Sequence, residues 1–576
     1  MLTSSRRARR RFMRAAVSTA TAVTVLVAAR LAGQASRPDP PRVVAFEGVT
    51  VVPMDRERVL ERQTVVVRDG RIARIGPSGA VRVPAGAIRV DGRGRYLMPG
   101  LADMHVHPYN TDQFVNYLAH GVTTIAVLNG SRYSLRWREQ VANGTLLGPT
   151  IYTAGPSLEG VPAGNPQFLS TATPDDGRRA VQAIAAAGYD LIKVYMTLTP
   201  ETYAAILAEA KAQRLVVAGH IPPQVGVDGV LRSGGQGMVA HAEEFFRERV
   251  DSAHRAARTA EIVRGVKAAG ITVIPNMSAY ADYIRSIKDL NEALADPEMR
   301  YASPAVYSEK LPSHNRSIRP NPQQFLAGAE RGLAMFRPFT KALSDAGVPL
   351  LLGTDAEFFG YVGASLHEEL RQMVAAGLTP YQALSAGTAA AGDYVAASVR
   401  GAERFGRIAV GQRADLVLLG ANPLESVANA ERIEGVMTRG RWLPAERLRT
   451  LRDSLAERFA PLRAGVLCFD SLVAAGRIDD AATTLGELRR ANPGSTPIAH
   501  IVMWVKAQRL LPTNPSGAVR LLEWNAEMYP ETHAAHAELA RGYLALGDTT
   551  RAMAAARRAL AIFPTHAAAR AIIERR

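Results

Sequence analysis

Apolar and polar residues alternate in short runs from Val43 to Met98, and glycine or proline interrupts the runs. Residues 64–72 show this pattern, because a run of three valines is followed by a polar turn that contains Gly70. This pattern is typical of small antiparallel strands joined by tight turns. Short strands of the same kind return between residues 400 and 445. We therefore expect 43–98 and 400–445 to pair in space as one composite β-sandwich.

The pattern changes between residues 99 and 399, where short β-branched runs alternate with helical stretches rich in Ala and Glu. This order predicts βαβ units and a parallel sheet. Eight candidate strands end near His107, Leu128, Thr153, Tyr195, His220, His241, Pro275 and Asp355. Eight such units predict an α/β fold, a (β/α)8 TIM barrel with its active site at the C-terminal ends of the strands. The long polar segment 276–336 is expected to form a partly helical lid over the barrel mouth.

The remaining chain, 446–576, has a helical pattern and a weak repeat. Pro493, Pro530 and Pro564 recur at spacings of 37 and 34 residues. The final unit matches the offsets of a tetratricopeptide repeat, with Leu539, Ala540, Tyr543, Gly547, Ala552, Ala559 and Pro564. A helical repeat region usually contacts a partner protein through its concave face. The alternative is a bundle that packs on the rest of the chain or on a second subunit of a homo-oligomer.

Residues 1–35 are typical of a signal peptide, with a basic start, an apolar stretch and small residues at the end. Residues 9–14 resemble the twin-arginine export motif. We expect an exported protein, periplasmic or extracellular, or one anchored to the membrane if the segment is not cleaved. Cys468 is the only cysteine, so an intramolecular disulfide is excluded.

The net charge of +16 raises the question of nucleic-acid binding. Seven of these charges come from arginines in residues 1–35, a segment that contains no acidic residue. No run of Lys and Arg interleaved with aromatic residues follows this segment. We therefore expect no nucleic-acid partner.

Four of the twelve histidines lie at the ends of candidate strands, namely His105, His107, His220 and His241. His105 and His107 are two positions apart, so on a strand both imidazoles leave the same face and can bind one metal ion. Asp355 also follows an apolar run.

The remaining histidines and Tyr195 are expected to have structural or surface roles, or to contact substrate. His120 is expected to end a helix, while Tyr195 and His367 either contact substrate or pack in the barrel. Surface positions are expected for His254, His314, His500, His533, His536 and His566.

Lys193 lies inside an apolar run, where an ammonium group is costly to bury. A buried lysine tends to lose its proton. As a neutral amine it can react with carbon dioxide to form a carbamate, whose two oxygens can bridge two cations. The alternative is an ordinary lysine that pairs with a carboxylate or extends its amine towards the strand end.

Several motifs together resemble the amidohydrolase superfamily, particularly its imidazolonepropionase-like and prolidase-like branch. They are MPGLADMHVH at 98–107, GVTT at 121–124, GTD at 353–355 and GQRADL at 411–416, with LHEEL at 366–370 and AGLTP at 376–380. The resemblance covers about residues 43–445 and does not extend into the helical tail.

The resemblance implies two divalent metal ions, with zinc as the expected ion. His105, His107 and Asp355 would bind one ion, His220 and His241 the other, and carboxylated Lys193 would bridge both. A hydroxide shared by the two ions would attack the substrate carbonyl. Asp355 would be the catalytic residue, accepting the proton and passing it to the leaving amine.

The chain departs from that branch at three places near the barrel mouth. Asn129-Gly130 stands where Arg-Asp is common, Pro275-Asn276 where Pro-Thr is usual, and Ala242-Glu243-Glu244 follows His241 in place of glycine. These departures concern the substrate more than the metal centre.

The leading hypothesis is therefore a metal-dependent hydrolase of C–N amide bonds. Its substrates would be small peptides, such as Xaa-Pro or other dipeptides, or cyclic amides and lactones. One alternative is a mononuclear deaminase or ring-opening hydrolase with an unmodified Lys193. Another is a non-catalytic scaffold that acts through its helical tail.

Overall fold

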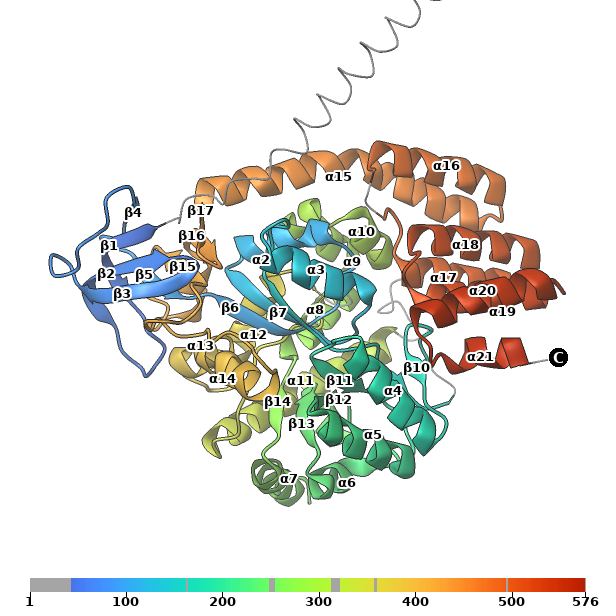
Figure 1. Cartoon of the computed structure of the whole chain (residues 1–576), viewed down its shortest axis with the longest axis horizontal. Helices are drawn as coiled ribbons and strands as arrows, with labels where there is room; N and C mark the ends of the chain where they lie inside the picture. Colours follow the sequence, from blue (N-terminus) through green and yellow to red (C-terminus); the bar gives the residue numbers. More distant parts are fainter. Residues whose placement is uncertain are drawn as a thin grey trace, which may run out of the picture.

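The computed structural model of the chain describes residues 43–161, 164–247, 254–311, 322–356, 360–493 and 496–574 (Figure 1). The expected export segment 1–35 and His314 lie outside these residues. Within the described part of the chain, no helix combines the length and the apolar character needed to cross a bilayer.

One eight-stranded sheet contains both flanking segments of the sequence. Its strands are β1 (Val44–Val51), β2 (Leu60–Arg68), β3 (Arg71–Pro77), β4 (Ile88–Asp91), β5 (Tyr96–Pro99), β15 (Leu416–Leu419), β16 (Ile433–Thr438) and β17 (Arg441–Pro444). The order is β17-β16-β15-β5-β1-β2-β3, and β4 pairs with β1. Because β15 pairs with β5 in antiparallel register, residues more than 300 positions apart in sequence form neighbouring strands.

A second group of strands is entirely parallel. Its members are β6 (Leu101–Val106), β7 (Val122–Val127), β8 (Thr150–Thr153), β11 (Leu191–Val194), β12 (Val216–Gly219), β13 (Gln236–Ala240) and β14 (Thr272–Ile274). Each pairs with the next within β6-β7-β8 and within β11-β12-β13-β14. The short strands β9 (Leu158–Glu159) and β10 (Leu169–Ser170) extend the second set beyond β11.

Three isolated parallel bridges join these sets. Ala154 with Leu191 connects β8 to β11, and Val273 with Leu350 connects β14 to the segment 350–356. Val106 with Ala356 connects this eighth segment back to β6. The pairings therefore return to their starting point, and we call the arrangement the parallel ring. Strands β6 and β7 are buried along their whole length, including polar residues such as Asp103 and Thr124.

Helices alternate with the ring strands. They are α2 (Phe114–Ala119), α3 (Arg132–Ala142), α4 (Pro174–Ala186), α5 (Pro200–Gln213), α6 (Gly226–Ser233), α7 (Arg255–Ala269), α8 (Met277–Lys288), α9 (Leu290–Ala295), α10 (Pro304–Lys310), α11 (Pro322–Asp345), α12 (Ala364–Ala375), α13 (Pro380–Ala386) and α14 (Ala389–Ser398). Four short 3-10 helices accompany them, η1 (Thr111–Gln113), η2 (Ala242–Phe246), η3 (Pro297–Tyr301) and η4 (Val427–Glu431). Local sequence sets many of their starts. Thr173, for example, caps α4 in a reciprocal bond with Asp176, and Pro174 occupies the first turn.

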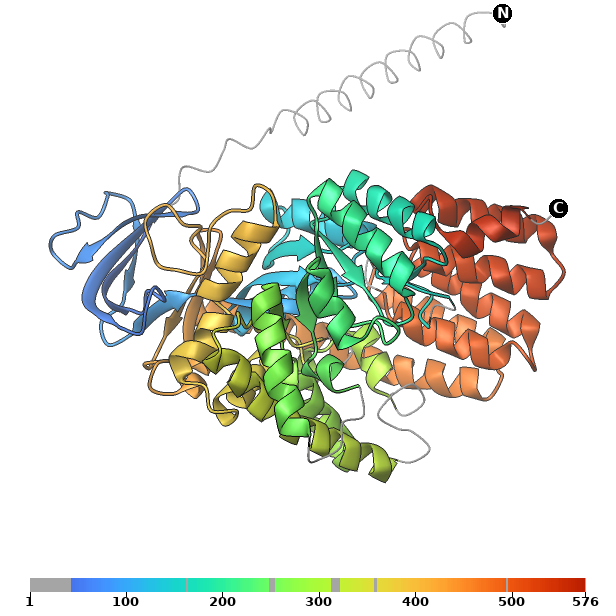
Figure 2. The ribbon, with the colours of Figure 1, turned by 90° about the horizontal axis from the view of Figure 1, so that it is seen from below.

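The C-terminal segment is wholly helical and lies against the parallel ring (Figures 1 and 2). Its helices are α15 (Ala445–Ala474), α16 (Ile478–Ala491), α17 (His500–Leu510), α18 (Pro515–Met528), α19 (His533–Ala545), α20 (Thr549–Ile562) and α21 (Ala567–Glu574). Consecutive helices pack as pairs, and the hydrophobic core of this tail includes Ala305 and Leu311 of the segment expected as a lid. Arg452 of α15 forms an ion pair with Glu298 at 2.5 Å, and its guanidinium lies 3.6 Å from the centre of the Tyr301 ring.

The expectation of surface positions for the tail histidines is wrong in three cases. His500, His533 and His566 have exposed fractions of only 1%, 5% and 7%. They are buried because the tail helices pack on one another and on the parallel ring, which a helical repeat pattern by itself does not reveal.

Candidate metal centre

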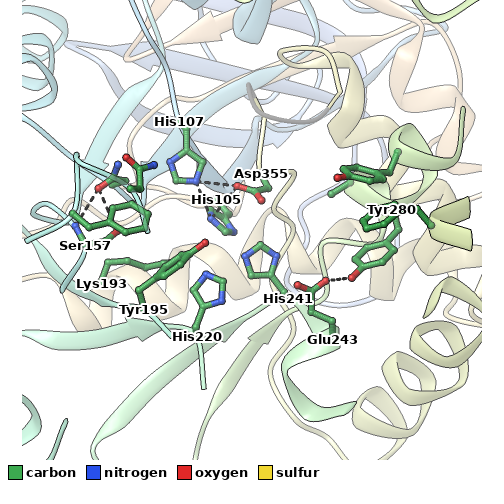
Figure 3. A pocket seen from close by; sticks show the side chains of 16 residues that line it. His105, His107, Ser157, Lys193, Tyr195, His220, His241, Glu243, Tyr280 and Asp355 are labelled. Atoms are coloured by element: carbon green, nitrogen blue, oxygen red, sulfur yellow. Dashed lines mark hydrogen bonds and ion pairs between the residues drawn. The ribbon is translucent and has the colours of Figure 1, made fainter. Parts of the chain in front are cut away.

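All six predicted metal ligands line one cavity of about 330 Å³ (Figure 3). His105 lies on β6 and His107 just after it, Lys193 lies on β11, and His220 and His241 directly follow β12 and β13. Asp355 belongs to the eighth segment of the ring. The six side chains meet because the parallel strands all end at the same side of the ring.

Two histidines and a carboxylate form the most compact part of the site. The Nε2 atoms of His105 and His107 are 3.2 Å apart, and Oδ1 of Asp355 lies 2.9 Å from His107 Nε2 and 3.4 Å from His105 Nε2. Among the described residues, His105, His241 and Asp355 form a group whose ligand atoms all lie within 4.8 Å of one another. These distances bring nitrogen and oxygen donors together in a way that suits a divalent cation.

Asn276 contacts the imidazole of His105 and the backbone of His241. Its Oδ1 lies 3.2 Å from His105 Nδ1 and accepts the backbone N–H of His241 at 3.2 Å. Because Oδ1 is an acceptor, His105 carries its proton on Nδ1, and its Nε2 lone pair faces the cavity. Asn276 is one of the departures that the sequence showed, and no role was predicted for it.

Glu244 holds His220 in the same manner. Its Oε1 lies 2.7 Å from His220 Nδ1, and its Oε2 accepts the backbone N–H of Ile221 at 3.0 Å. Arg247 adds a 2.5 Å ion pair to the same carboxylate. Burial acts to raise the pKa of Glu244, but His220 and Arg247 outweigh it and hold the pKa below its usual range. The carboxylate therefore stays ionised and directs the other nitrogen of His220 away from itself.

Lys193 is 2% exposed, and its Nζ has no hydrogen-bond partner among the described residues. Burial lowers the pKa of this amine to about 8, although Asp355 and Glu244 oppose the shift. With a pKa of about 8, roughly a tenth of the amine is neutral at pH 7, and this neutral form is the one that carbamate formation requires.

Four of the other ligand candidates, namely His105, His220, His241 and Asp355, have pKa values shifted towards the ionisation states that metal binding needs. Burial lowers the pKa of His241 to about 3 and the pKa of His220 and His105 below the usual range. Burial opposes ionisation of Asp355, but the neighbouring imidazoles hold its pKa below the usual range. Neutral imidazoles and an ionised carboxylate are the forms that coordinate a cation.

The backbone at the strand ends is strained. His241, Asn276 and Asp355 have φ values of 73°, 53° and 58°, in the left-handed region that residues with a side chain seldom adopt. Such strain costs on the order of 1–3 kcal/mol per residue and is typical of functional sites. The side chains of His241 and Asp355 line the cavity, and that of Asn276 contacts His105 behind it.

Sequence reasoning missed most of the substrate-facing wall. The cavity is also lined by Asn129, Ser157, Asn165, Phe168, Tyr195, Glu243, Ala279, Tyr280, Tyr283 and Phe325. Of these residues, the sequence suggests substrate contact only for Tyr195. It marks Asn129 and Glu243 only as departures from the motifs of the related branch. The Tyr280 hydroxyl donates to Glu243 Oε2, as Figure 3 shows, and burial raises the pKa of Glu243 to about 7.

His120 and His367 lie outside the cavity and contact each other in the fold. His367 Nε2 donates to the backbone carbonyl of His120 at 2.9 Å, and burial lowers the pKa of His367 to about 3. His120 ends α2, as expected, and lies 3.1 Å from Glu298. Neither residue lines the cavity described above.

Comparisons with known proteins agree with this geometry. The sequence profile of the Amidohydrolase family matches residues 96–443. The ochratoxinase of Aspergillus niger is 22% identical over 459 residues, which is 68% of this chain and 83% of the relative. The solved structure of a bottromycin amidohydrolase has a TM-score of 0.57 at 26% identity, and the match covers 73% of this chain and 91% of that protein.

A Xaa-Pro dipeptidase with bound methionine in its active site has a TM-score of 0.54 at 19% identity, covering 70% of this chain and 100% of that one. The family profile matches more than half of the chain and includes every predicted ligand. The chain belongs to the amidohydrolase family, and the helices after residue 443 lie outside the match.

Proposed function

We propose that this protein is a hydrolase of C–N amide bonds that uses two divalent metal ions, with zinc as the preferred ion. The observation that carries the proposal is the convergence of four histidines, Asp355 and the buried Lys193 on one cavity. We further propose that the parallel ring is the (β/α)8 barrel predicted from the sequence, with the cavity at its mouth.

The residues fit a binuclear centre. His105, His107 and Asp355 would hold one ion, and His220 and His241 the other. Lys193 Nζ is buried without a partner among the described residues, a situation that a carbamate bound to both ions would resolve. When bound, the two ions would supply Lewis-acid polarisation of the carbonyl and a water of lowered pKa.

The chain's own groups would handle the protons. Asp355 lies among the ligands with its carboxylate ionised, so it can accept the proton of the attacking water. The water oxygen adds to the carbonyl carbon, the C–N bond breaks, and the proton leaves on the amine nitrogen. The orientation of His220 by Glu244 and of His105 by Asn276 keeps the ligand set in place.

The cavity supports a small substrate with apolar groups. Phe168, Tyr195, Tyr280, Tyr283 and Phe325 contribute aromatic surface, and Asn129 and Asn165 contribute amides. Dipeptides such as Xaa-Pro, acylated amino acids and cyclic amides all fit this description. The names of the related ochratoxinase, bottromycin amidohydrolase and Xaa-Pro dipeptidase support amide hydrolysis as the shared chemistry.

Export of the chain, with residue 36 as the start of the mature protein, also belongs to the proposal. So does a role for the helical tail in contacts beyond the barrel, either with a partner protein or with a second copy of the chain.

The decisive experiment measures metal content per chain in protein produced from residue 36 onward with zinc supplied. Wild type is compared with Lys193→Ala and with Lys211→Ala, a matched control on the exposed face of α5. We expect about two ions in wild type and in the control, and a sharp fall together with loss of amide hydrolysis in Lys193→Ala. One ion that the mutation leaves unchanged would instead favour a mononuclear deaminase, and none would favour a scaffold.

A further inference from the structure

A second cavity lies between the parallel ring and the helical tail. Its volume is about 70 Å³. On the ring side it is lined by His107, Asn129 and Gln167, and on the tail side by His500, Tyr529 and His533. We call it the tail chamber. His107 and Asn129 also line the large cavity, so the tail chamber directly adjoins the candidate metal centre.

The tail is attached to the ring beside this chamber. Arg136 of α3 forms a 2.7 Å ion pair with Glu531, and the Tyr133 hydroxyl accepts the Glu531 N–H at 3.3 Å. Arg132 donates to the carbonyl of Ala561 at 2.9 Å. On the far side, Ser308 Oγ accepts the buried N–H of Ala499 at 3.2 Å, next to His500. These contacts hold the wall of the tail chamber in place without closing it.

His500 lines the tail chamber and has a buried hydrogen-bond acceptor. Its Nδ1 lies 3.1 Å from Asn525 Oδ1, and the Asn525 amide nitrogen donates to the carbonyl of His500 at 3.4 Å. The second bond sets the orientation of the Asn525 amide, so His500 carries its proton on Nδ1. Its Nε2 then has a lone pair and no partner among the described residues. Burial lowers the pKa of His500 to about 4, so the ring is neutral near pH 7.

His533 adds a second buried imidazole. It is 5% exposed, and its Nδ1 also lacks a partner among the described residues. Burial holds the pKa of His533 well below its usual range. The described lining of the chamber contains no Lys or Arg. A carboxylate would therefore meet no cationic side chain of the described lining, whereas a group with N–H donors would satisfy the buried acceptor of His500.

We propose that the helical tail completes the substrate site, and that the tail chamber binds an amino or carboxamide end of the substrate through His500 Nε2. This inference rests on the proposed function, because it concerns the substrate of the same centre. A cavity of about 70 Å³ accommodates a group of only a few heavy atoms. The tail thereby limits what can extend from the scissile bond and selects against a carboxylate at that end.

The test uses two pairs of probes that differ in N–H donors. The first pair is alanyl-prolinamide and its N,N-dimethylamide. The second is alanyl-proline and N,N,N-trimethylalanyl-proline, which keeps the positive charge. The full mature chain is compared with His500→Asn, in which the amide nitrogen can still donate to Asn525, and with His500→Gln, in which an amide oxygen can replace Nε2. His536→Asn on α19 is the control, since His536 does not line the chamber.

The first readout is hydrolysis. We expect His500→Asn to lower kcat/KM about tenfold for the N–H member of one pair, because one hydrogen bond is lost, and to leave its alkylated partner unchanged. His500→Gln should recover much of the loss, and the control should behave as wild type. Equal effects on both members of each pair would overturn the proposal.

The second readout does not require turnover. In the histidine-¹⁵N-labelled chain, the His500 Nε2 resonance, identified by its absence in His500→Asn, should move upfield on addition of the N–H probe only. If no probe is hydrolysed but this selective shift occurs, the proposed function fails and the tail chamber inference stands. If probes are hydrolysed but the resonance does not move, the inference fails, the chamber holds only solvent, and the proposed function stands.

Discussion

At the scale of single residues, the environment of Lys193 links stability to chemistry. A charged lysine amine without a partner is costly to bury inside a protein. Burial therefore lowers the pKa of Lys193 to about 8, which favours the uncharged amine. The same change produces the neutral amine, whose lone pair can attack carbon dioxide. The cost of placing lysine on β11 is therefore tied to the modification that we propose for it.

Glu244 and Glu243 are adjacent residues with different expected roles. Glu244 bonds to His220, whereas Glu243 lines the cavity and accepts from Tyr280. We expect Glu244→Gln to weaken zinc binding by about 10–100-fold, because the imidazole loses the charged partner that orients it. Competition of the purified protein against a chelator measures this affinity.

Glu243→Gln is the matched comparison. This variant should retain its zinc and change KM instead, because its side chain faces the substrate cavity. Equal zinc loss in both variants would mean that the two carboxylates act on the metal ligands together, contrary to the assignment above.

At the scale of secondary-structure elements, the ends of the ring strands determine the site. Gly219 ends β12 immediately before His220 and has a φ of 131°. A Cβ at this position would lie 2.3 Å from the carbonyl oxygen of Val194 and 3.0 Å from Cδ of Lys193. The backbone of β11 cannot yield easily, so only glycine lets these two strands bring Lys193 and His220 together.

We expect Gly219→Ala to destabilise the chain by about 3 kcal/mol or more, because the strain of a positive φ adds to a backbone clash. Gly188→Ala is the control, since Gly188 has a φ of 82° with no atom within 4 Å of the added Cβ. The control should cost only about 1 kcal/mol. Urea unfolding of both variants measures the difference, and similar losses would show that the clash is relieved by local movement.

Arg413, just before β15 of the eight-stranded sheet, forms a buried ion pair and also contacts the ring. Arg413 Nε lies 2.5 Å from Asp415 Oδ2, with both side chains no more than 2% exposed, and Arg413 also donates to Thr124 on β7 at 2.8 Å. We expect Arg413→Met to cost about 3–5 kcal/mol, because it leaves the Asp415 carboxylate buried without its partner. Chemical denaturation measures the loss.

The exposed pair of Arg93 and Asp91 provides the control, with side chains 82% and 55% exposed. Arg93→Met should leave the free energy of unfolding almost unchanged, because water screens an exposed ion pair. The double variant Arg413→Met/Asp415→Leu should be more stable than Arg413→Met alone. A double variant as unstable as the single one would contradict an uncompensated charge as the cause.

At the scale of the whole molecule, the buried tail histidines make folding sensitive to acid. The pKa of His500 is about 4 in the folded chain and about 6.5 when unfolded. Between these values the unfolded chain binds a proton that the folded chain does not, so stability falls as the pH drops from 6.5 to 4. His533 and His566 have pKa values lowered by burial and act in the same direction.

We expect His500→Gln to reduce this acid sensitivity by up to about 3 kcal/mol over that range, because glutamine does not titrate. The free energy of unfolding is measured in urea at several pH values for wild type and variant. Parallel pH curves for the two proteins would show that His500 is not the buried neutral group that the structure indicates.

Much of the site could be predicted from the sequence because its signal is local. Each of His220, His241 and Asp355 follows an apolar run, and parallel strands have their ends on one side of a ring. The spacing of His105 and His107 places two imidazoles on one face of a strand. A lysine within an apolar run shows its unusual burial without any knowledge of the fold. The family motifs are likewise continuous stretches of sequence.

Only the tertiary structure decided which residues support and surround those ligands. Glu244 and Asn276 act through bonds to histidines 24 and 171 positions away. The aromatic residues of the cavity come from α8, from α11 and from the segments around Phe168 and Tyr195. The burial of His500 and His533 depends on how the tail packs against α3 and the ring. Such contacts join distant parts of the chain, so no local pattern of apolar and polar residues carries them.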